Sequence, residues 1–377
     1  MNQPSEVLMV RSSPLQLLST AILIFLMVGC ARPPELIGVD NPQYPAASLE
    51  LDRQKVFIAT TRQATEVTGA FFTAQRAPEL GLASVEVTIP PGHVPGKIER
   101  ARQLPPDPRR EFSIVDPTVY GSDGAFIAAL NKALAEKPPG QRSVMFFVHG
   151  YNTSASDGIL RLAQFVQDSK FEGVPVLFTW ASAARTPRYV YDLNSALVAR
   201  AKLKEITEIL TRTNAEGFGI FAHSMGTFLT MEGMVDAQLA GRLKSHDKLE
   251  HIVLAAPDID IDLFRTQVGM LPVSVREKLY VLVSKDDFAL RISRRIAGGV
   301  PRVGAADTAA LERLGVTVID LSKIHDQSSS NHTKFAGSPQ VVQIIGQGLN
   351  ANTQFSKSPS PALGQLLAAS PIQVFGN

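Results

Sequence analysis

A serine near the middle of the chain has the neighbours that a nucleophilic serine requires. It lies in the stretch Phe221-Ala222-His223-Ser224-Met225-Gly226. A short apolar run precedes the stretch and helical apolar spacing follows it, which predicts a strand, a tight turn and a helix. Such a turn lifts the serine hydroxyl beyond the sheet edge, and it requires small residues two before and two after the serine. Ala222 and Gly226 meet this condition, so the pattern predicts a covalent nucleophile at Ser224.

A serine nucleophile needs a base that accepts its proton. After Ser224, His246 lies in a polar loop and His251 opens a predicted strand. His325 and His332 both follow the last predicted strand, at residues 316–319. The chain order serine, acid, histidine places the base there. Residue type and spacing leave both of these histidines open.

Two groups of carboxylates could orient that base. Each group follows a predicted strand, at residues 252–255 and 279–283, and together they are Asp258, Asp260, Asp262, Asp286 and Asp287. Asp260 also suits the N-cap of a helix, and Asp286 suits a solvated partner of Lys285. The acid should lie just beyond a strand end, and both groups satisfy this requirement.

Backbone amides are expected to stabilise the oxyanion that forms when the serine attacks. The first should be the N–H of Met225, directly after the nucleophile, and the second should come from the loop after the strand at residues 144–148. That loop contains His149, Gly150 and Tyr151, and Tyr151 is the expected second donor. His149 precedes Ser224 in the chain and is expected to be a buried structural histidine.

The elements that would position these groups form a regular series. Mostly apolar runs at residues 144–148, 174–180, 217–221, 252–255, 279–283 and 316–319 alternate with helical segments. Earlier runs at 55–60 and 83–89 also predict strands. The alternation predicts a parallel sheet covered on both faces. In such sheets the active crevice lies at the carboxyl ends of the strands, where every candidate residue falls.

Further motifs accompany the serine in a fixed order. They are Phe147-Val148-His149-Gly150-Tyr151-Asn152, Phe178-Thr179-Trp180-Ala181-Ser182, Tyr191-Asp192, Leu254-Ala255-Ala256-Pro257-Asp258 and Ser284-Lys285-Asp286-Asp287-Phe288-Ala289-Leu290. The series resembles a bacterial α/β-hydrolase family that was long catalogued as of unknown function and is grouped with esterase and lipase enzymes. The resemblance spans about residues 55–349. It implies the α/β-hydrolase fold, with a mostly parallel central sheet and helices on both faces.

The resemblance also selects among the open candidates. The family pattern Ser-x-x-Asp-x-Ala-Leu matches residues 284–290 and selects Asp287 as the acid. Its terminal histidine loop matches Asn331-His332-Thr333-Lys334-Phe335 and selects His332 as the base. The chain departs from the family at Ala181, where proline is usual, and at Thr227, where asparagine is usual. Both departures bear on substrate preference.

The N-terminal region predicts export and lipid attachment. A mostly apolar run at residues 15–28 is too short to span a bilayer comfortably and ends just before Cys30, the only cysteine. It resembles a bacterial lipoprotein signal in which Cys30 is lipidated after cleavage. The expected division is a signal peptide at 1–29, a tether at 30–49, the hydrolase domain at 50–349 and a tail without fixed structure at 350–377. Ala31 after the cysteine implies the periplasmic face of the outer membrane.

Composition excludes several other classes of protein. Lys plus Arg number 37 and Asp plus Glu 35, so a net charge of +2 argues against a nucleic-acid binder. There is no zinc-protease motif, P-loop or dinucleotide glycine pattern, so no metal or cofactor is expected. The basic cluster Arg291, Arg294 and Arg295 is expected to be a solvated helix face. The predicted activity is serine hydrolysis of a small-molecule or lipid ester. The alternatives are a catalytically silent binding module and a serine peptidase or amidase.

Overall fold

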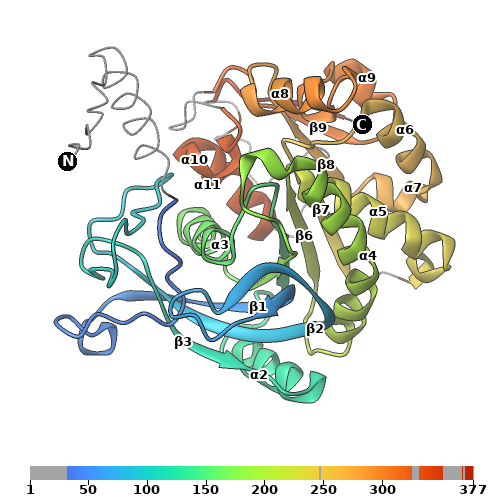
Figure 1. The fold of residues 1–377 in the computed structure, drawn as a ribbon. Coiled ribbons are helices and arrows are strands. Elements are labelled where there is room, and N and C mark those ends of the chain that lie inside the picture. The colour runs from blue at the N-terminus through green and yellow to red at the C-terminus, as the bar shows by residue number, and fades with distance from the viewer. Residues whose placement is uncertain (1–31, 246–247, 325–330, 351–366, 368–369, 377) are drawn as a thin grey trace, which may run out of the picture.

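The computed structural model describes residues 32–245, 248–324, 331–350, 367 and 370–376. Within them a ten-stranded sheet has the order β10-β9-β8-β7-β6-β4-β5-β1-β2-β3 (Figure 1). The strands are β1 (Asp52–Ala64), β2 (Phe72–Ile89), β3 (Ser113–Val119), β4 (Val144–Val148), β5 (Val174–Thr179), β6 (Phe218–His223), β7 (Leu249–Ala255), β8 (Leu279–Val283), β9 (Thr317–Asp320) and β10 (Gln373–Phe375).

The middle of the sheet is parallel, and antiparallel strands lie at its two edges. The strands from β1 through β5, β4, β6, β7 and β8 to β9 pair in parallel, whereas β2, β3 and β10 join antiparallel. All five residues of β4 and all five of β8 are buried, as continuous apolar runs predict for strands covered on both faces.

Helices cover both faces of this sheet (Figure 1). One core lies under α3 (Ala155–Ser169), α10 (Lys334–Gly337) and α11 (Pro339–Asn350). The other lies under α2 (Asp123–Ala135), α4 (Tyr189–Thr211), α5 (Met225–Leu239), α6 (Ile261–Met270), α7 (Val273–Arg276) and α9 (Thr308–Glu312). The remaining elements are α8 (Phe288–Ile296) and the 3₁₀ turns η1 (Ala46–Ser48), η2 (Thr186–Arg188), η3 (Arg242–Ser245) and η4 (Val303–Ala305). The predicted parallel sheet with helices on both faces is therefore confirmed.

The segment predicted to be a tether packs against the domain over its described part, residues 32–49. Leu36 and Ile37 are buried in the core beneath α3. The Leu36 amide donates to Ser156 Oγ at 2.9 Å, and the Ile37 amide donates to the Gly69 carbonyl at 2.9 Å. A proline-rich composition suggests a free linker, but two apolar residues are enough to dock it.

The C-terminal tail also departs from its prediction in part. Ile372 is buried, and Gln373–Phe375 forms β10 against β9. The short apolar stretch pairs with the exposed edge of β9, which would otherwise present unpaired backbone groups. Cys30 and the predicted signal peptide lie outside the described residues. Among the residues that the structure describes, no helix is both long enough and apolar enough to cross a membrane.

Candidate active site

Ser224 occupies a strained turn at the carboxyl end of β6, a central strand. Its φ of 52° and ψ of −124° lie in a region that non-glycine residues rarely adopt. The turn is held by several hydrogen bonds. The Ser224 amide donates to the Ala255 carbonyl at 2.9 Å, and Thr227 Oγ1 donates to the Ser224 carbonyl at 2.6 Å. Thr227, where the resembled family has asparagine, thus fixes the turn from inside α5.

Close contact between this turn and the loop after β4 explains why small residues flank the serine. A Cβ at Gly226 would lie 2.4 Å from the His149 carbonyl oxygen, which is far inside van der Waals contact. A Cβ at Gly150 would lie 2.8 Å from Ser224 Cβ. Glycine at both positions lets the β4 loop lie directly against the serine, as an oxyanion site requires.

The structure brings Asp287 and His332 together beside this turn. His332 Nδ1 lies 2.7 Å from Asp287 Oδ2. Asp287 is fully buried, and its other oxygen accepts a 3.0 Å hydrogen bond from the Leu290 amide as the N-cap of α8. The His332 carbonyl lies 3.1 Å from Nε2 of His223, the residue before the serine. The acid–imidazole pair is therefore anchored to the residue next to Ser224.

Burial lowers the pKa of His223 well below its ordinary value, and the neighbouring His332 lowers it further. His223 is therefore neutral near pH 7. A neutral ring can donate Nε2–H to the His332 carbonyl without placing a second positive charge beside the acid–imidazole pair. His223 thus acts as a hydrogen-bonding support for the histidine loop.

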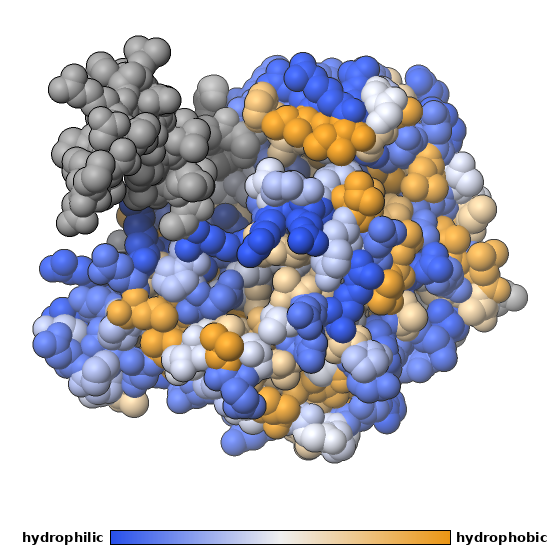
Figure 2. Space-filling model, viewed as in Figure 1, coloured by the Kyte–Doolittle hydropathy of each residue, from blue (hydrophilic) through white to orange (hydrophobic). Residues whose placement is uncertain are grey.

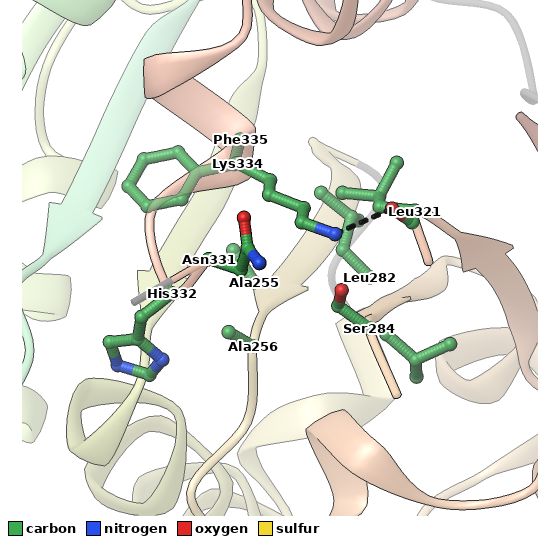
Figure 3. A pocket seen from close by; sticks show the side chains of 10 residues that line it. Ala255, Ala256, Leu282, Ser284, Leu321, Asn331, His332, Lys334 and Phe335 are labelled. Atoms are coloured by element: carbon green, nitrogen blue, oxygen red, sulfur yellow. Dashed lines mark hydrogen bonds between the residues drawn. The ribbon is translucent and has the colours of Figure 1, made fainter. Parts of the chain in front are cut away.

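The neighbouring carboxylate, Asp286, has a different partner. It accepts a 2.6 Å hydrogen bond from Nζ of Lys334, a buried lysine that also donates to the Leu321 carbonyl at 3.0 Å (Figure 3). Burial acts to raise the pKa of Asp286, but the hydrogen bonds from Lys334 and Ser284 outweigh it, and the pKa falls below its usual value. Asp286 therefore holds Lys334, two residues after His332, in place. Ser284, His332 and Lys334 help to line a cavity of about 10 Å³, which is too small for an acyl chain.

The carboxylate after β7, Asp258, belongs to a separate buried network. Tyr189 donates to Asp258 Oδ2 at 3.0 Å, Ser293 donates to Oδ1, and Arg302 Nε lies 3.2 Å from Oδ1. These contacts tie the start of α4 to α8. Among the other candidates, Asp260 caps α6 as expected, and His251 is buried with its pKa lowered to about 4 by burial. His246 and His325 lie outside the described residues.

The proposed oxyanion donors come from two elements that converge on the serine. Met225 is the first residue of α5, so its amide N–H has no carbonyl one turn earlier within the helix. Tyr151 lies in the β4 loop, directly after the glycine that contacts Ser224. Its ring packs edge-on against Tyr189 with centroids 5.3 Å apart. The backbone of this loop thus borders the space in front of the serine.

A buried carboxylate holds the β4 loop in place. Asp192, in the first turn of α4, accepts from the Asn152 amide at 3.1 Å, from Ser182 Oγ at 2.6 Å and from the Ala183 amide at 2.6 Å. Its side chain thereby joins the loops after β4 and β5. Residue spacing assigned no role to Asp192. The available signal was a lone acid at the start of a helix, within a motif of the resembled family.

Behind the loop, a second set of buried polar groups supports it. Arg62 donates to Thr179 Oγ1 at 2.8 Å and to the Thr153 carbonyl at 2.7 Å, and burial lowers its pKa to about 10. Trp180 Nε1 donates to the His149 carbonyl at 2.8 Å. Burial, and then the charge of Arg62, lowers the pKa of His149 to about 3, so this ring is neutral and structural.

Removing the charge of Asp192 should loosen the loop. In Asp192→Asn, an amide group faces donors that the carboxylate satisfied, so we expect the free energy of unfolding to fall by about 2 kcal/mol, measured by urea denaturation. Asp236→Asn is the matched control: its carboxylate is 44% exposed and paired only at the surface with Arg200, so stability should change by less than about 0.5 kcal/mol. Equal losses in the two variants would contradict this role of Asp192.

The sheet order, the strained strand–turn–helix and the loops at the carboxyl edge define an α/β-hydrolase fold. The sequence profile of the family described as alpha/beta hydrolase of unknown function (DUF900) matches residues 123–348. The chain belongs to this family.

Solved structures of esterases also resemble the chain. A structure from a study of two esterases of Rhizomucor miehei is 12% identical in sequence to this chain, with a TM-score of 0.34. The match covers 81% of this chain and 87% of that one. Carboxyl esterase 2 from Tuber melanosporum gives 12% identity, 91% and 99% coverage and a TM-score of 0.37. A mutant of the esterase rPPE gives 15% identity, 89% and 97% coverage and a TM-score of 0.37. No curated protein matches the chain.

Proposed function

We propose that this protein is a serine hydrolase that cleaves carboxylic esters or related acyl bonds. Ser224 is the nucleophile, His332 the general base and then the general acid, and Asp287 the group that orients His332. The observation that carries the proposal is a strained serine on the turn beside the 2.7 Å contact of Asp287 with His332. With Nδ1 of His332 on Asp287, the proposal assigns the other ring nitrogen, Nε2, to the serine hydroxyl.

The proposed reaction proceeds through an acyl-enzyme. Ser224 Oγ attacks the ester carbonyl while its proton passes to Nε2 of His332. The amides of Met225 and Tyr151 hold the resulting oxyanion. Collapse expels the alcohol, which receives the proton from His332, and water then releases the acid by the same steps.

Labelling with a fluorophosphonate tests this proposal, because the probe reacts with an activated serine. We expect an adduct on Ser224 after peptide mapping, and its loss in Ser224→Ala and His332→Ala. p-Nitrophenyl esters of graded length would then define acyl preference. An adduct on another residue, or full labelling of a folded His332→Ala protein, would contradict the assigned triad. A folded, unlabelled and inactive wild type would favour the silent binding module.

We also propose that the protein is anchored to the cell envelope through lipid on Cys30, on the periplasmic face of the outer membrane. The support is the short apolar run that ends just before the only cysteine. Cys30→Ser should abolish incorporation of labelled palmitate and shift the protein out of the membrane fraction. A wild type that takes up no labelled palmitate would refute this anchor.

A further inference from the structure

Helix α8 turns large apolar side chains toward solvent. Phe288, Ile292 and Ile296 are 52%, 41% and 55% exposed, and their spacing of four residues places them in one stripe. The buried side of the helix holds Leu290 and Ser293 instead. Figure 2 shows the stripe as a hydrophobic band over α8, bordered by hydrophilic side chains. A helix that only covers a core places its large apolar residues inward. The exposed stripe therefore indicates a surface that contacts a partner.

Cationic side chains line one side of the stripe. Arg291, Arg294 and Arg295 are exposed, and the Arg291 guanidinium lies 5.5 Å from the centre of the Phe288 ring. The helix contains no acidic residue. An apolar stripe with arginines beside it is the pattern of a helix that lies in a membrane interface, its apolar side among acyl chains and its cations among anionic headgroups. Charge thus favours an anionic lipid surface as the partner.

The stripe begins next to the proposed site. Phe288 directly follows Asp287, and α8 starts just beyond the carboxyl end of β8. This is the edge of the sheet at which the Ser224 turn lies on β6. An element bound along α8 would therefore border the space in front of the serine.

The N-terminal segment reaches the same edge on the other side of β6. Arg32 donates to the Ala184 carbonyl, in the loop after β5, and to Asp157, in the first turn of α3. In the sheet, β6 lies between β8 and the adjacent pair β4 and β5. Cys30 is two residues from Arg32, which limits their separation to about 7 Å. A lipid on Cys30 would thus place a membrane at this edge, with the serine between the anchor and α8.

We propose that α8 docks the active-site edge onto an anionic phospholipid surface, with Phe288, Ile292 and Ile296 inserted among the acyl chains and the three arginines on the headgroups. The inference rests on the proposed anchor and hydrolase function, and it deepens them. The substrate is a lipid ester drawn from the surface on which the protein sits. Because residues 32–49 pack on the domain, the anchor holds this edge close to the bilayer.

Fluorescence quenching by lipid-borne nitroxides tests the docking. The full-length chain carrying Ile292→Cys is labelled with bimane and reconstituted into phosphatidylcholine vesicles with or without phosphatidylglycerol. Nitroxides on the acyl chains report contact with the hydrocarbon. The matched control is Met270→Cys, which is 45% exposed at the end of α6, toward the opposite edge of the sheet. The parent chain, treated identically, measures any label that reaches Cys30.

We expect strong quenching at position 292 in vesicles that contain phosphatidylglycerol and little at position 270. Replacing Arg291, Arg294 and Arg295 by glutamine should lower the ratio of docked to undocked protein on the order of 100-fold. Equal quenching at positions 292 and 270 would overturn the proposal. So would quenching at position 292 that is the same with and without phosphatidylglycerol and with and without the three arginines. So would concentration-dependent protection of position 292 without vesicles, which would assign the stripe to a second copy of the chain.

The measurement separates this inference from the proposed function. Quenching requires no turnover, so Ser224→Ala should be quenched at position 292 as strongly as the parent. A wild-type protein that docks but is inactive would refute the hydrolase function and support docking through α8. A protein that is active but does not dock would support the hydrolase function and refute the docking. The thermal unfolding midpoint of each variant checks that α8 remains folded.

Discussion

Ser224→Ala and His332→Ala should each lower the rate of ester hydrolysis on the order of 10³-fold or more, and the double variant should lose little beyond either one. Both changes disable the same step. Without Ser224 there is no nucleophile, and without His332 no base accepts the serine proton, so neither variant can form the acyl-enzyme efficiently. The measurement is kcat/KM for a soluble p-nitrophenyl ester with the three variants and the parent. Stability should change little, because we propose that the strained turn holds the Ser224 hydroxyl for catalysis and not for folding.

Ser274→Ala, an exposed serine in α7, serves as the control for serine removal and should retain the parental rate. Multiplicative losses in the double variant would show that Ser224 and His332 act in separate steps. That outcome would remove His332 from the role of base even if both single variants are slow.

Asp287→Asn should lower turnover by orders of magnitude. In the proposed triad, the carboxylate at 2.7 Å accepts Nδ1–H of His332, and Nε2 is then unprotonated and can accept the serine proton. An amide NH₂ in its place favours the opposite tautomer, a change that costs about 10⁴-fold in the best-studied serine enzymes. Asparagine is also a good N-cap, so the bond to the Leu290 amide and the start of α8 are retained. The measured loss therefore reports orientation of the histidine rather than melting of a helix.

Two other substitutions sharpen the test of Asp287. Asp262→Asn, an exposed aspartate in α6, should leave kcat unchanged. Asp286→Asn should mainly reduce stability, because it removes the negative charge that compensates the buried Lys334 ammonium. A large loss from Asp258→Asn, with Asp287→Asn close to the parental rate, would instead move the acid to the end of β7.

The tertiary structure decided which carboxylate contacts which histidine. Spacing alone left Asp258, Asp286 and Asp287 open, because a position beyond a strand end does not specify where a side chain points. Family resemblance favoured Asp287, and the structure places Asp287 Oδ2 2.7 Å from His332 Nδ1. Asp286, one residue earlier, points to Lys334 instead. Both residues lie in the turn before α8, where neighbouring side chains point in different directions, and linear spacing cannot resolve that.

Tertiary packing also decided the role of segments whose composition is polar or mixed. The sequence predicts a free tether at 30–49, since composition averages over the segment and gives little weight to Leu36 and Ile37. Those two residues are buried in the core beside α3. In α8 the sequence identified the arginines as an exposed face. Only packing shows that Phe288, Ile292 and Ile296 are exposed beside them, because Leu290 and Ser293 occupy the buried side.

The sequence by itself identified every strand except the edge strands β3 and β10, and it identified the turn that carries Ser224. Continuous apolar runs such as residues 144–148 and 279–283 can be satisfied only in a sheet covered on both faces, so local composition is enough to identify them. The small residues around Ser224 similarly reflect a local steric requirement, now visible as the contact of Gly226 with the β4 loop. What depended on side-chain direction or on contacts between distant segments could be settled only by the folded chain, because those contacts are set by packing and not by neighbours in sequence.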